Sequence, residues 1–548
     1  MDLYIDGSVL FDGQYTVNLV PSSKCALMLC KYPNTLTAVK VNIVLSDNEY
    51  SLLHSDDINH YESSLRSLDY DAKIIKFSQL IDDYKVVDLP LSVSVGKFLI
   101  HSGPAAVYRS LVQYFYKPGE KIPVFGTAQS CLKACKERSK WTLMCEKTII
   151  DLISSYICDG DRFNDDMFSD LSASFIIHKS SPLNAESRSK KNLHKFLEGP
   201  RKTLSDIIIS FFMLDFSLID SKFSGIVAKY PVLFDWLNLM RLDKLGEITS
   251  SLRFLPISWD SKESRLQTND DHTFSIIKGL EKMTVSIRNT TELRDLLSVS
   301  EIAGLKINFS PMEDLAFDWS GVPELLRPYQ SQIPAARQQK KSDQLINMVS
   351  IGNRVIQPGM TVIDFCSGGG HLGLMVAAMH PECRVVLLEN KEESLSMAES
   401  RISQSGLSNV RLYQCNIFAF KGHFDVGLAL HACGSVTDLV MEICASRGAH
   451  MVISPCCHGS IAPNGNIGYP RSHRFSEHVP LDVYSKLSHA ADCFNAKPAR
   501  IQLGNEAMSL IDSDRAQYAA EHGYAVEIFK MVPADCTPKN HVLFFKKN

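Results

Sequence analysis

The feature that most constrains the fold is a glycine-rich loop between a short apolar strand and an apolar helix. We predict a strand over Thr361–Phe365 (TVIDF), which runs into CSGGGHLG and then into the helical stretch LGLMVAAMH. Gly368, Gly370 and Gly373 have the spacing G-x-G-x-x-G. Glycine allows a tight turn from a strand into a helix and lets backbone N–H groups approach a ligand. The spacing serves dinucleotides and S-adenosylmethionine alike, and a plain strand–helix turn also uses it.

Polar residues follow the three strands that we predict after this loop. Strands alternate with helices here, a pattern typical of an open, mostly parallel sheet. The carboxyl ends of parallel strands meet at one edge of a sheet, where such folds bind ligands. The strands and the residues after them are Arg384–Leu388 with Glu389 and Asn390, Val410–Tyr413 with Gln414 to Phe418, and Phe424–Leu430 with His431 to Gly434.

The choice between a dinucleotide and S-adenosylmethionine depends on Asp364, which precedes the glycines, and on Asn416, which is placed to hydrogen-bond an adenine amine. A dinucleotide fold has no need of either residue. The region resembles class I S-adenosylmethionine-dependent methyltransferases, and this resemblance implies a Rossmann-like domain with S-adenosylmethionine as cofactor. Cys366 departs from the pattern, because the family often has glycine there. The cofactor residues implied are Asp364, Cys366, Gly368, Gly370, Glu389, Asn390, Asn416 and Ile417.

A second motif, Leu430 to Gly459, contains a His-x-Cys-Gly step, a Thr-Asp pair and a Pro-Cys-Cys-His step in fixed order. It resembles a methyltransferase branch that includes transfer-RNA 2'-O-methyltransferases, so RNA is the acceptor that the resemblance favours. The candidate catalytic residues are His431 and His458 as bases and Cys456 and Cys457 along the methyl path. The alternative is that the two cysteines are buried small hydrophobic residues in a tight turn.

A metal site is not predicted. Cys433, Cys456, Cys457 and His458 lie in the same motif and are residues that can bind zinc, but no cysteine pair with the two-residue spacing of a zinc knuckle is present.

The N-terminal half resembles glutathione transferases. Leu89–Phe115 is similar to the end of their thioredoxin-like domain, with Pro90 and Ser102 at the glutathione-binding positions, although Ser102 as a helix N-cap is the simpler interpretation. His101 stands where the family has an acidic residue, so glutathione binding is not expected. Farther on, Thr203–Asp206 has the pattern of a capping box before an apolar helix, which is a folding device.

Length and composition agree with this division. At 548 residues the chain is long enough for two or three domains. We predict a degenerate thioredoxin-like region over 1–118, an all-helical glutathione-transferase-C-like domain over 125–260, a connector over 261–334 and the methyltransferase-like domain over 335–548. The last sheet ends in a hairpin of Tyr524–Met531 and His541–Lys546, so its final strand is antiparallel.

Charge and cysteine usage give only broad predictions. The net charge of -4 excludes a global attraction to nucleic acid, so RNA contact needs local groups such as Arg471, Arg474 or the basic helix start at Ala335–Lys341. Fifteen scattered cysteines and the absence of a long apolar run favour reduced thiols, a cytoplasmic location and no membrane contact.

Together the two halves resemble one family along nearly the whole chain, the glutathione S-transferase C-terminal domain-containing proteins. The resemblance implies a methyltransferase dependent on S-adenosylmethionine and, because transferase-like folds often pair, a homodimer through the N-terminal half. One alternative is a non-catalytic interaction protein with a vestigial methyltransferase domain. A glutathione-conjugating enzyme is a third hypothesis, and His101 speaks against it.

Overall fold

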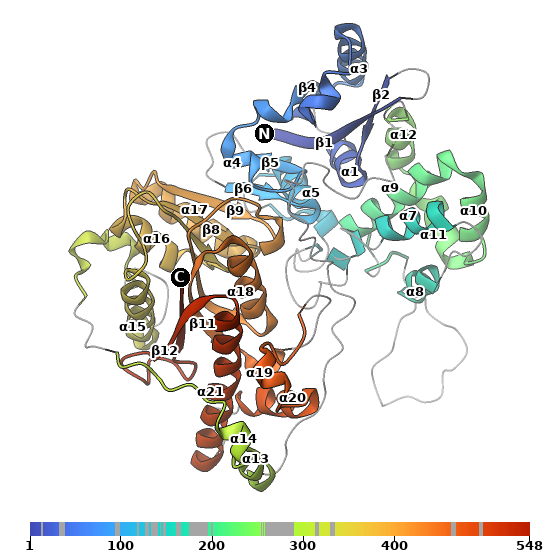
Figure 1. The fold of residues 1–548 in the computed structure, drawn as a ribbon. Coiled ribbons are helices and arrows are strands. Elements are labelled where there is room, and N and C mark those ends of the chain that lie inside the picture. The colour runs from blue at the N-terminus through green and yellow to red at the C-terminus, as the bar shows by residue number, and fades with distance from the viewer. Residues whose placement is uncertain are drawn as a thin grey trace. The chain divides into compact units, whose positions relative to one another are not determined.

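The structure is a computed structural model that divides into an N-terminal unit, Met1–Thr268 with Ala419–Lys421, and a C-terminal unit, Asn269–Phe418 with Gly422–Asn548 (Figure 1). The described residues are 1–11, 15–31, 39–93, 99–117, 120–125, 131–132, 141–142, 144–145, 149–159, 166–174, 195–198, 201–253, 255, 257, 290–312, 317–328, 335–461, 467–492 and 497–548. Most of the predicted connector lies outside them. None of the helices in these ranges is long and apolar enough to cross a membrane.

The N-terminal unit has a small mixed sheet in the order β6-β5-β1-β3-β4, with β2 paired to β1. Strands β3 and β4 run parallel to β1, whereas β5 is antiparallel to it. The strands are β1 (Asp2–Phe11), β2 (Tyr15–Leu19), β3 (Lys40–Leu45), β4 (Asp71–Lys76), β5 (Leu91–Val93) and β6 (Leu99–Ser102). The helices are α1 (Pro21–Leu29), α2 (Asp47–Tyr50), α3 (Ser55–Ser67), α4 (Asp82–Lys85), α5 (Pro104–Tyr114), α7 (Ile149–Asp159), α8 (Asp166–Ser174), α9 (Leu204–Ile219), α10 (Ser221–Val227), α11 (Pro231–Arg241) and α12 (Lys244–Ser251).

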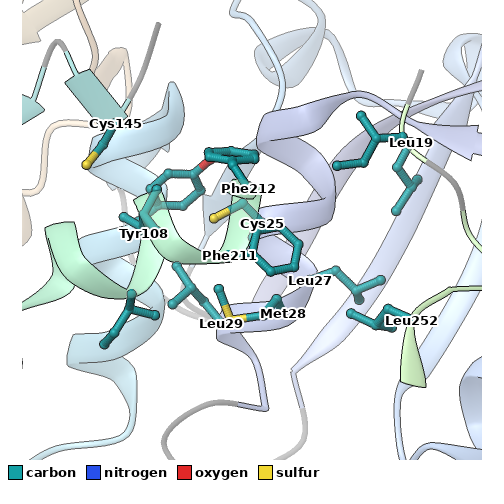
Figure 2. Packing of buried hydrophobic residues seen from close by; sticks show 14 of the residues in the cluster. Leu19, Cys25, Leu27, Met28, Leu29, Tyr108, Cys145, Phe211, Phe212 and Leu252 are labelled. Carbon is teal, nitrogen blue, oxygen red and sulfur yellow. The ribbon is translucent and has the colours of Figure 1, made fainter. Parts of the chain in front are cut away.

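One hydrophobic core joins the α/β region of this unit to its helices. Every residue of α1 is buried, and Figure 2 shows Cys25 and Met28 near Phe211 and Phe212 of α9. A buried ion pair of 2.6 Å between Lys24 Nζ and Asp215 Oδ1 also connects the two helices. The predicted domains 1–118 and 125–260 both fall inside this unit, and their boundary stays a prediction.

Two N-terminal predictions can be compared with the structure. The capping box is confirmed, because the Asp206 carboxylate accepts hydrogen bonds from Thr203 N and Thr203 Oγ1, both at 2.9 Å. Ser102 as an N-cap is wrong: Gly103 caps α5, and the Ser102 hydroxyl donates to the Asp88 carbonyl at 2.7 Å.

The C-terminal unit is built on a seven-stranded sheet in the order β12-β13-β11-β10-β7-β8-β9. Strands β11, β10, β7, β8 and β9 run parallel to one another. Strand β13 is antiparallel to both of its neighbours. The predicted fold class, a mostly parallel Rossmann-like sheet with an antiparallel last strand after an α/β and a helical region, is confirmed. The strands are β7 (Thr361–Phe365), β8 (Arg384–Glu389), β9 (Val410–Gln414), β10 (Val426–Cys433), β11 (His450–Cys456), β12 (Tyr524–Lys530) and β13 (His541–Lys547).

Strand order reverses between β7 and β10, and this reversal determines where a ligand site forms. Right-handed crossovers place the helices that follow β7 and β8 on one face and the helix that follows β10 on the other. Figure 1 shows α15 and α16 on one side of the sheet and α18 and α21 on the other. The helices are α13 (Thr290–Leu297), α14 (Ser300–Ala303), α15 (Ala335–Gly352), α16 (His371–Met379), α17 (Glu392–Ser405), α18 (Ser435–Arg447), α19 (His473–Ser476), α20 (Leu481–Ala490) and α21 (Pro498–Glu521). Open α/β sheets bind their ligands at the carboxyl edge of such a reversal.

Candidate functional site

Asp364 lies at the centre of the site, near the carboxyl end of β7. Its side chain is buried, and Oδ2 accepts a hydrogen bond of 2.9 Å from Gly373 N in the first turn of α16. Burial raises the pKa of this carboxyl group to about 7, although the Gly373 hydrogen bond opposes the shift. A Cβ on Gly373 would lie 2.1 Å from Leu387 Cδ2, so only glycine permits this close approach of helix to strand. The sheet therefore fixes a carboxyl group directly beneath the glycine loop.

The glycine loop is open at Gly368 and has an unusual backbone. Gly368 and Gly370 have φ values of 56° and 79°, and a Cβ on Gly368 would meet nothing within 4 Å. Cys366, which departs from the methyltransferase pattern, also has a positive φ of 55°. It therefore adopts the left-handed conformation that a glycine would adopt there with less strain.

Glu389, the last residue of β8, connects this strand end to the loop. Its Oε2 accepts from Gly368 N at 2.8 Å, and its Oε1 accepts from Asn390 N at 2.7 Å and from Lys391 N at 2.9 Å. A carboxylate has about four lone-pair positions, so it retains acceptor capacity for a ligand hydroxyl. The side chain is half-buried, so part of it remains exposed.

The remaining predicted cofactor residues lie on the next strand ends. The register pairs Glu389 with Gln414, so the ends of β8 and β9 are level. Gln414 Nε2 donates to the Asn390 carbonyl at 3.1 Å and holds these ends together. Asn390 and Asn416 are exposed, and Ile417 is buried beside them in the chain. The structure thus brings the predicted cofactor residues to three successive strand ends of one edge.

Three basic side chains that the sequence prediction did not assign to the cofactor lie close to this edge. Arg401 donates to the Gly369 carbonyl, and the positive charge of Lys341 acts on the Asp364 carboxyl group. His371 Nδ1 is buried and has no hydrogen-bond partner among the described residues. Burial, with the charges of Arg401 and Lys341, lowers the pKa of His371 to about 3, so its ring is neutral at pH 7. A neutral imidazole within the influence of two cations suits an anionic ligand group.

His431 is held in an irregular part of β10. The register with β11 shifts between Leu430 and Ala432, and His431 has a φ of 66°. Its Nε2 lies 2.9 Å from Gln344 Oε1. Burial, followed by the charge of Lys341, lowers the pKa of His431 to about 4. The predicted strand ended before His431, whereas β10 continues through Cys433 because the bulge absorbs the extra residue.

Cys433, Cys456 and Cys457 converge where β10 and β11 end. The Sγ atoms of Cys433 and Cys456 are 3.2 Å apart, and those of Cys433 and Cys457 are 3.4 Å apart. Hydrogen bonding from the Cys456 thiol lowers the pKa of Cys433 to about 6. Cys433 is exposed, Cys457 half-buried and Cys456 buried. The interpretation of Cys456 as a buried packing residue therefore fits its burial but not its sulfur neighbours.

His458 follows these cysteines in sequence but lies in a different environment. Its ring is fully buried, with Nε2 3.0 Å from Asp512 Oδ1 and Nδ1 3.2 Å from Lys539 Nζ. Because Lys539 can only donate, Nδ1 is the acceptor and the Nε2 proton points to Asp512. His458 thus belongs to an internal network with Arg515 and His541.

Arg471 is also unavailable for the RNA contact considered from sequence. Its guanidinium donates to Glu442 and lies 3.7 Å from Asp438 Oδ1, with only 3% of the side chain exposed. Arg474 is exposed.

Comparison with known proteins agrees with this arrangement. Residues 339–464 match a family model described as "Methyltransferase domain". A glutathione S-transferase C-terminal domain-containing protein homolog from Drosophila melanogaster is 29% identical and covers 100% of both chains. A homolog of the same name from Drosophila pseudoobscura pseudoobscura is 29% identical over 98% of each chain. The Homo sapiens protein is 27% identical over 87% of this chain and 88% of its own.

Among solved structures, a SAM-dependent methyltransferase from Aquifex aeolicus has 14% identity and a TM-score of 0.23, covering 41% of this chain and 97% of its own. A TM-score this low supports no structural conclusion. The resemblance predicted from the motifs is confirmed by the curated relatives: over nearly its whole length the chain is similar to the glutathione S-transferase C-terminal domain-containing proteins, and it carries a methyltransferase domain in its C-terminal half.

Proposed function

We propose that the C-terminal unit binds S-adenosylmethionine and transfers its methyl group to an RNA acceptor. The observation that carries the cofactor assignment is the set of Asp364, the open glycine loop and Glu389 at the strand-order reversal, within the residues that match a methyltransferase domain. This is the position where open α/β sheets bind nucleotide-like ligands.

The residues present fit each part of this cofactor. Glu389 has spare acceptor capacity for ribose hydroxyls, and the exposed Asn416 side chain suits the adenine amine. The space above Gly368, which a side chain would fill, admits a ligand close to the backbone. The unpartnered His371 Nδ1, together with Lys341 and Arg401, suits the carboxylate of the methionine part, and the Asp364 carboxyl group suits its amine.

The cofactor supplies a methyl group made electrophilic by a sulfonium, and the protein must orient an acceptor and take up its proton. The low pKa of His431 leaves its imidazole neutral, so it can accept a hydrogen bond or a proton, although it is a weak base. Cys456 is the last residue of β11, the neighbour of β10, and Cys457 follows it. We propose that the acceptor enters at this end of β11. His458 has both nitrogens engaged in a buried network, which makes a positioning role a better proposal than that of a base.

RNA as the acceptor rests on the likeness of the Leu430–Gly459 motif to the transfer-RNA methyltransferase branch. Arg474 and Arg337, the latter at the basic start of α15, are exposed cations that suit a phosphate backbone, whereas Arg471 is already paired. We also propose a cytoplasmic location, a homodimer through the N-terminal unit and no glutathione binding. The absence of glutathione binding is supported by the Ser102 hydroxyl, which already donates a hydrogen bond to the Asp88 carbonyl.

The test is calorimetric titration of S-adenosylmethionine, S-adenosylhomocysteine, NAD and glutathione into the full chain. We expect micromolar binding of the two adenosyl ligands and none of NAD or glutathione. Glu389→Gln should weaken adenosyl binding at least tenfold, about 1.4 kcal/mol, because the neutral amide is a poorer acceptor for the ribose hydroxyls. The matched control is Glu382→Gln, an exposed carboxylate in the turn before β8, which should bind as the native chain does.

The outcomes separate the hypotheses. Adenosyl binding without methyl transfer to total RNA would leave a cofactor-binding protein whose acceptor is not RNA. Absence of adenosyl binding in the folded protein would overturn the proposal in favour of the non-catalytic interaction protein. Binding of glutathione alone would favour the conjugating enzyme.

A further inference from the structure

We propose that Cys433, Cys456 and Cys457 form a zinc site with one coordination position open to a non-protein ligand. The Sγ atoms of all three lie within 4.8 Å of one another, with separations of 3.2 Å and 3.4 Å from Cys433. In a tetrahedral zinc site with Zn–S bonds of about 2.3 Å, neighbouring sulfurs are about 3.8 Å apart. The cluster therefore needs only small side-chain adjustments to hold the ion. This inference goes beyond the proposed methyl transfer and does not depend on it.

Strand pairing brings together cysteines that are far apart in sequence. Cys433 and Cys456 are register partners on the parallel strands β10 and β11, 23 residues apart. A backbone hydrogen bond of 3.0 Å from Gly434 N to the Cys456 carbonyl fixes the two strand ends together. The sequence lacks a cysteine pair with the two-residue spacing of a zinc knuckle, and strand pairing brings three sulfurs together without one.

The backbone around the cluster is held in conformations that most residues avoid. Cys457 has a φ of 51°, a left-handed conformation that is rare for a side chain with a Cβ. Gly434 has a φ of 56°, and a Cβ there would lie 2.7 Å from the Ser460 carbonyl oxygen. The turns after β10 and β11 are therefore packed against each other, and this packing places the third sulfur beside the paired two. Such strain is found where a site requires a particular geometry.

Sulfur chemistry selects the kind of ion. Three thiol groups at these separations repel one another when they ionise, and a bound cation removes that repulsion. Thiolates are soft ligands that favour zinc and related ions over magnesium or calcium. On binding, the thiol protons leave to solvent as Zn–S bonds form, so no oxidant or reductant is required.

The fourth position is open among the described residues. His458, the nearest histidine in sequence, is engaged with Asp512 and Lys539 and does not join the cluster. Closed structural zinc sites have four protein ligands, whereas sites with three keep a position for water or a substrate atom. Cys433 is exposed, so the cluster is reachable from the surface at the carboxyl edge of the sheet. A water molecule or a donor atom of a small molecule would occupy the fourth position.

The test uses the full chain, purified under reducing conditions without a chelator. Elemental analysis should find about one zinc per chain. After zinc removal, Co²⁺ titration should give the intense visible and near-ultraviolet absorption of a tetrahedral thiolate site. Cys433→Ser and Cys457→Ser should each lower metal affinity at least tenfold.

The matched control is Cys383→Ser. Cys383 lies just before β8, and its thiol donates to the Gln357 carbonyl at 3.1 Å, a hydrogen bond that serine can keep. This variant should retain zinc and the cobalt spectrum. Circular dichroism of every variant separates ligand loss from misfolding, and the cobalt spectrum of the unmutated chain decides even if a variant fails to fold.

Three results would overturn the proposal: unmutated protein that neither contains zinc nor binds cobalt, serine variants at Cys433 and Cys457 that keep full metal affinity, or a Cys433–Cys456 disulfide that persists under reduction. The metal measurements do not require S-adenosylmethionine. Failure of adenosyl binding with zinc present, or the reverse, therefore shows which of the two proposals is wrong.

Discussion

At the scale of single residues, Asp364 is predicted to make stability depend on pH. Burial raises its pKa from 3.8 to about 7 in the folded chain, so the folded state binds more protons than the unfolded state between these values. The free energy of unfolding therefore falls as pH rises through that window, by on the order of 4 kcal/mol from this group. Asp364→Asn keeps an acceptor for Gly373 N but does not ionise, so it should remove this loss.

The measurement is urea-induced unfolding of both proteins at pH values from 4 to 8. The readout is pulsed hydrogen exchange in peptides from β7 and β8. We expect the variant to gain stability relative to the native chain as pH rises toward 7. If the free energy of unfolding changed equally with pH in the two proteins, Asp364 would ionise in the folded chain as it does in the unfolded chain.

Individual side-chain roles were predictable only in part. Asp364 and Glu389 were identified because a carboxylate at a strand end has a position that the chain pattern defines. Lys341 was interpreted as part of a basic helix start, since sequence does not show that its charge lies close to Asp364. His371 lies inside the GGGHLG run, so the sequence already places it next to the glycine loop and it could have been predicted. The convergence of the three cysteines was not predicted, because spacing rules describe ligands that are close in sequence and not the pairing of distant strands.

At the scale of elements, the start of α9 depends on one carboxylate. Asp206 is buried and accepts from Thr203 N, Thr203 Oγ1, Leu197 N and Trp236 Nε1 at distances of 2.9 to 3.0 Å. Asp206→Ala leaves these donors without their acceptor, which we expect to lower the free energy of unfolding of the N-terminal unit by about 2–4 kcal/mol. Asp235→Ala, at an exposed position of α11, should change it by less than about 0.5 kcal/mol.

Thermal and urea unfolding of both variants, monitored by far-ultraviolet circular dichroism, checks this expectation. A loss below about 1 kcal/mol for Asp206→Ala would show that water replaces the lost acceptor and that the cap is not central to α9.

Element positions followed from the sequence wherever periodicity and glycine agreed. The strand Thr361–Phe365 has the predicted bounds, and the final hairpin differs from prediction by one residue at the ends of its strands. The exception is β10, where a bulge carries the strand past His431 to Cys433. A bulge depends on how two distant strands align, and a single stretch of sequence does not record that alignment. The same limit explains why the cap of α5 was assigned one residue too early.

At the scale of the whole molecule, adenosyl binding should stabilise only part of the chain. A ligand at 100 times its dissociation constant adds about 2.7 kcal/mol to the stability of the state that binds it. With S-adenosylhomocysteine at that ratio, we expect slower hydrogen exchange in peptides that contain the Gly368 loop, Glu389 and Asn416. Peptides from Leu89–Phe115, where a glutathione transferase would bind its ligand, should exchange at their original rate. Glutathione at the same concentration should slow exchange nowhere. Ligand-induced protection reports where binding energy is gained. Protection of Leu89–Phe115 by glutathione, with no protection of the glycine loop by the adenosyl ligand, would therefore place the ligand site in the N-terminal unit and contradict the proposed cofactor site.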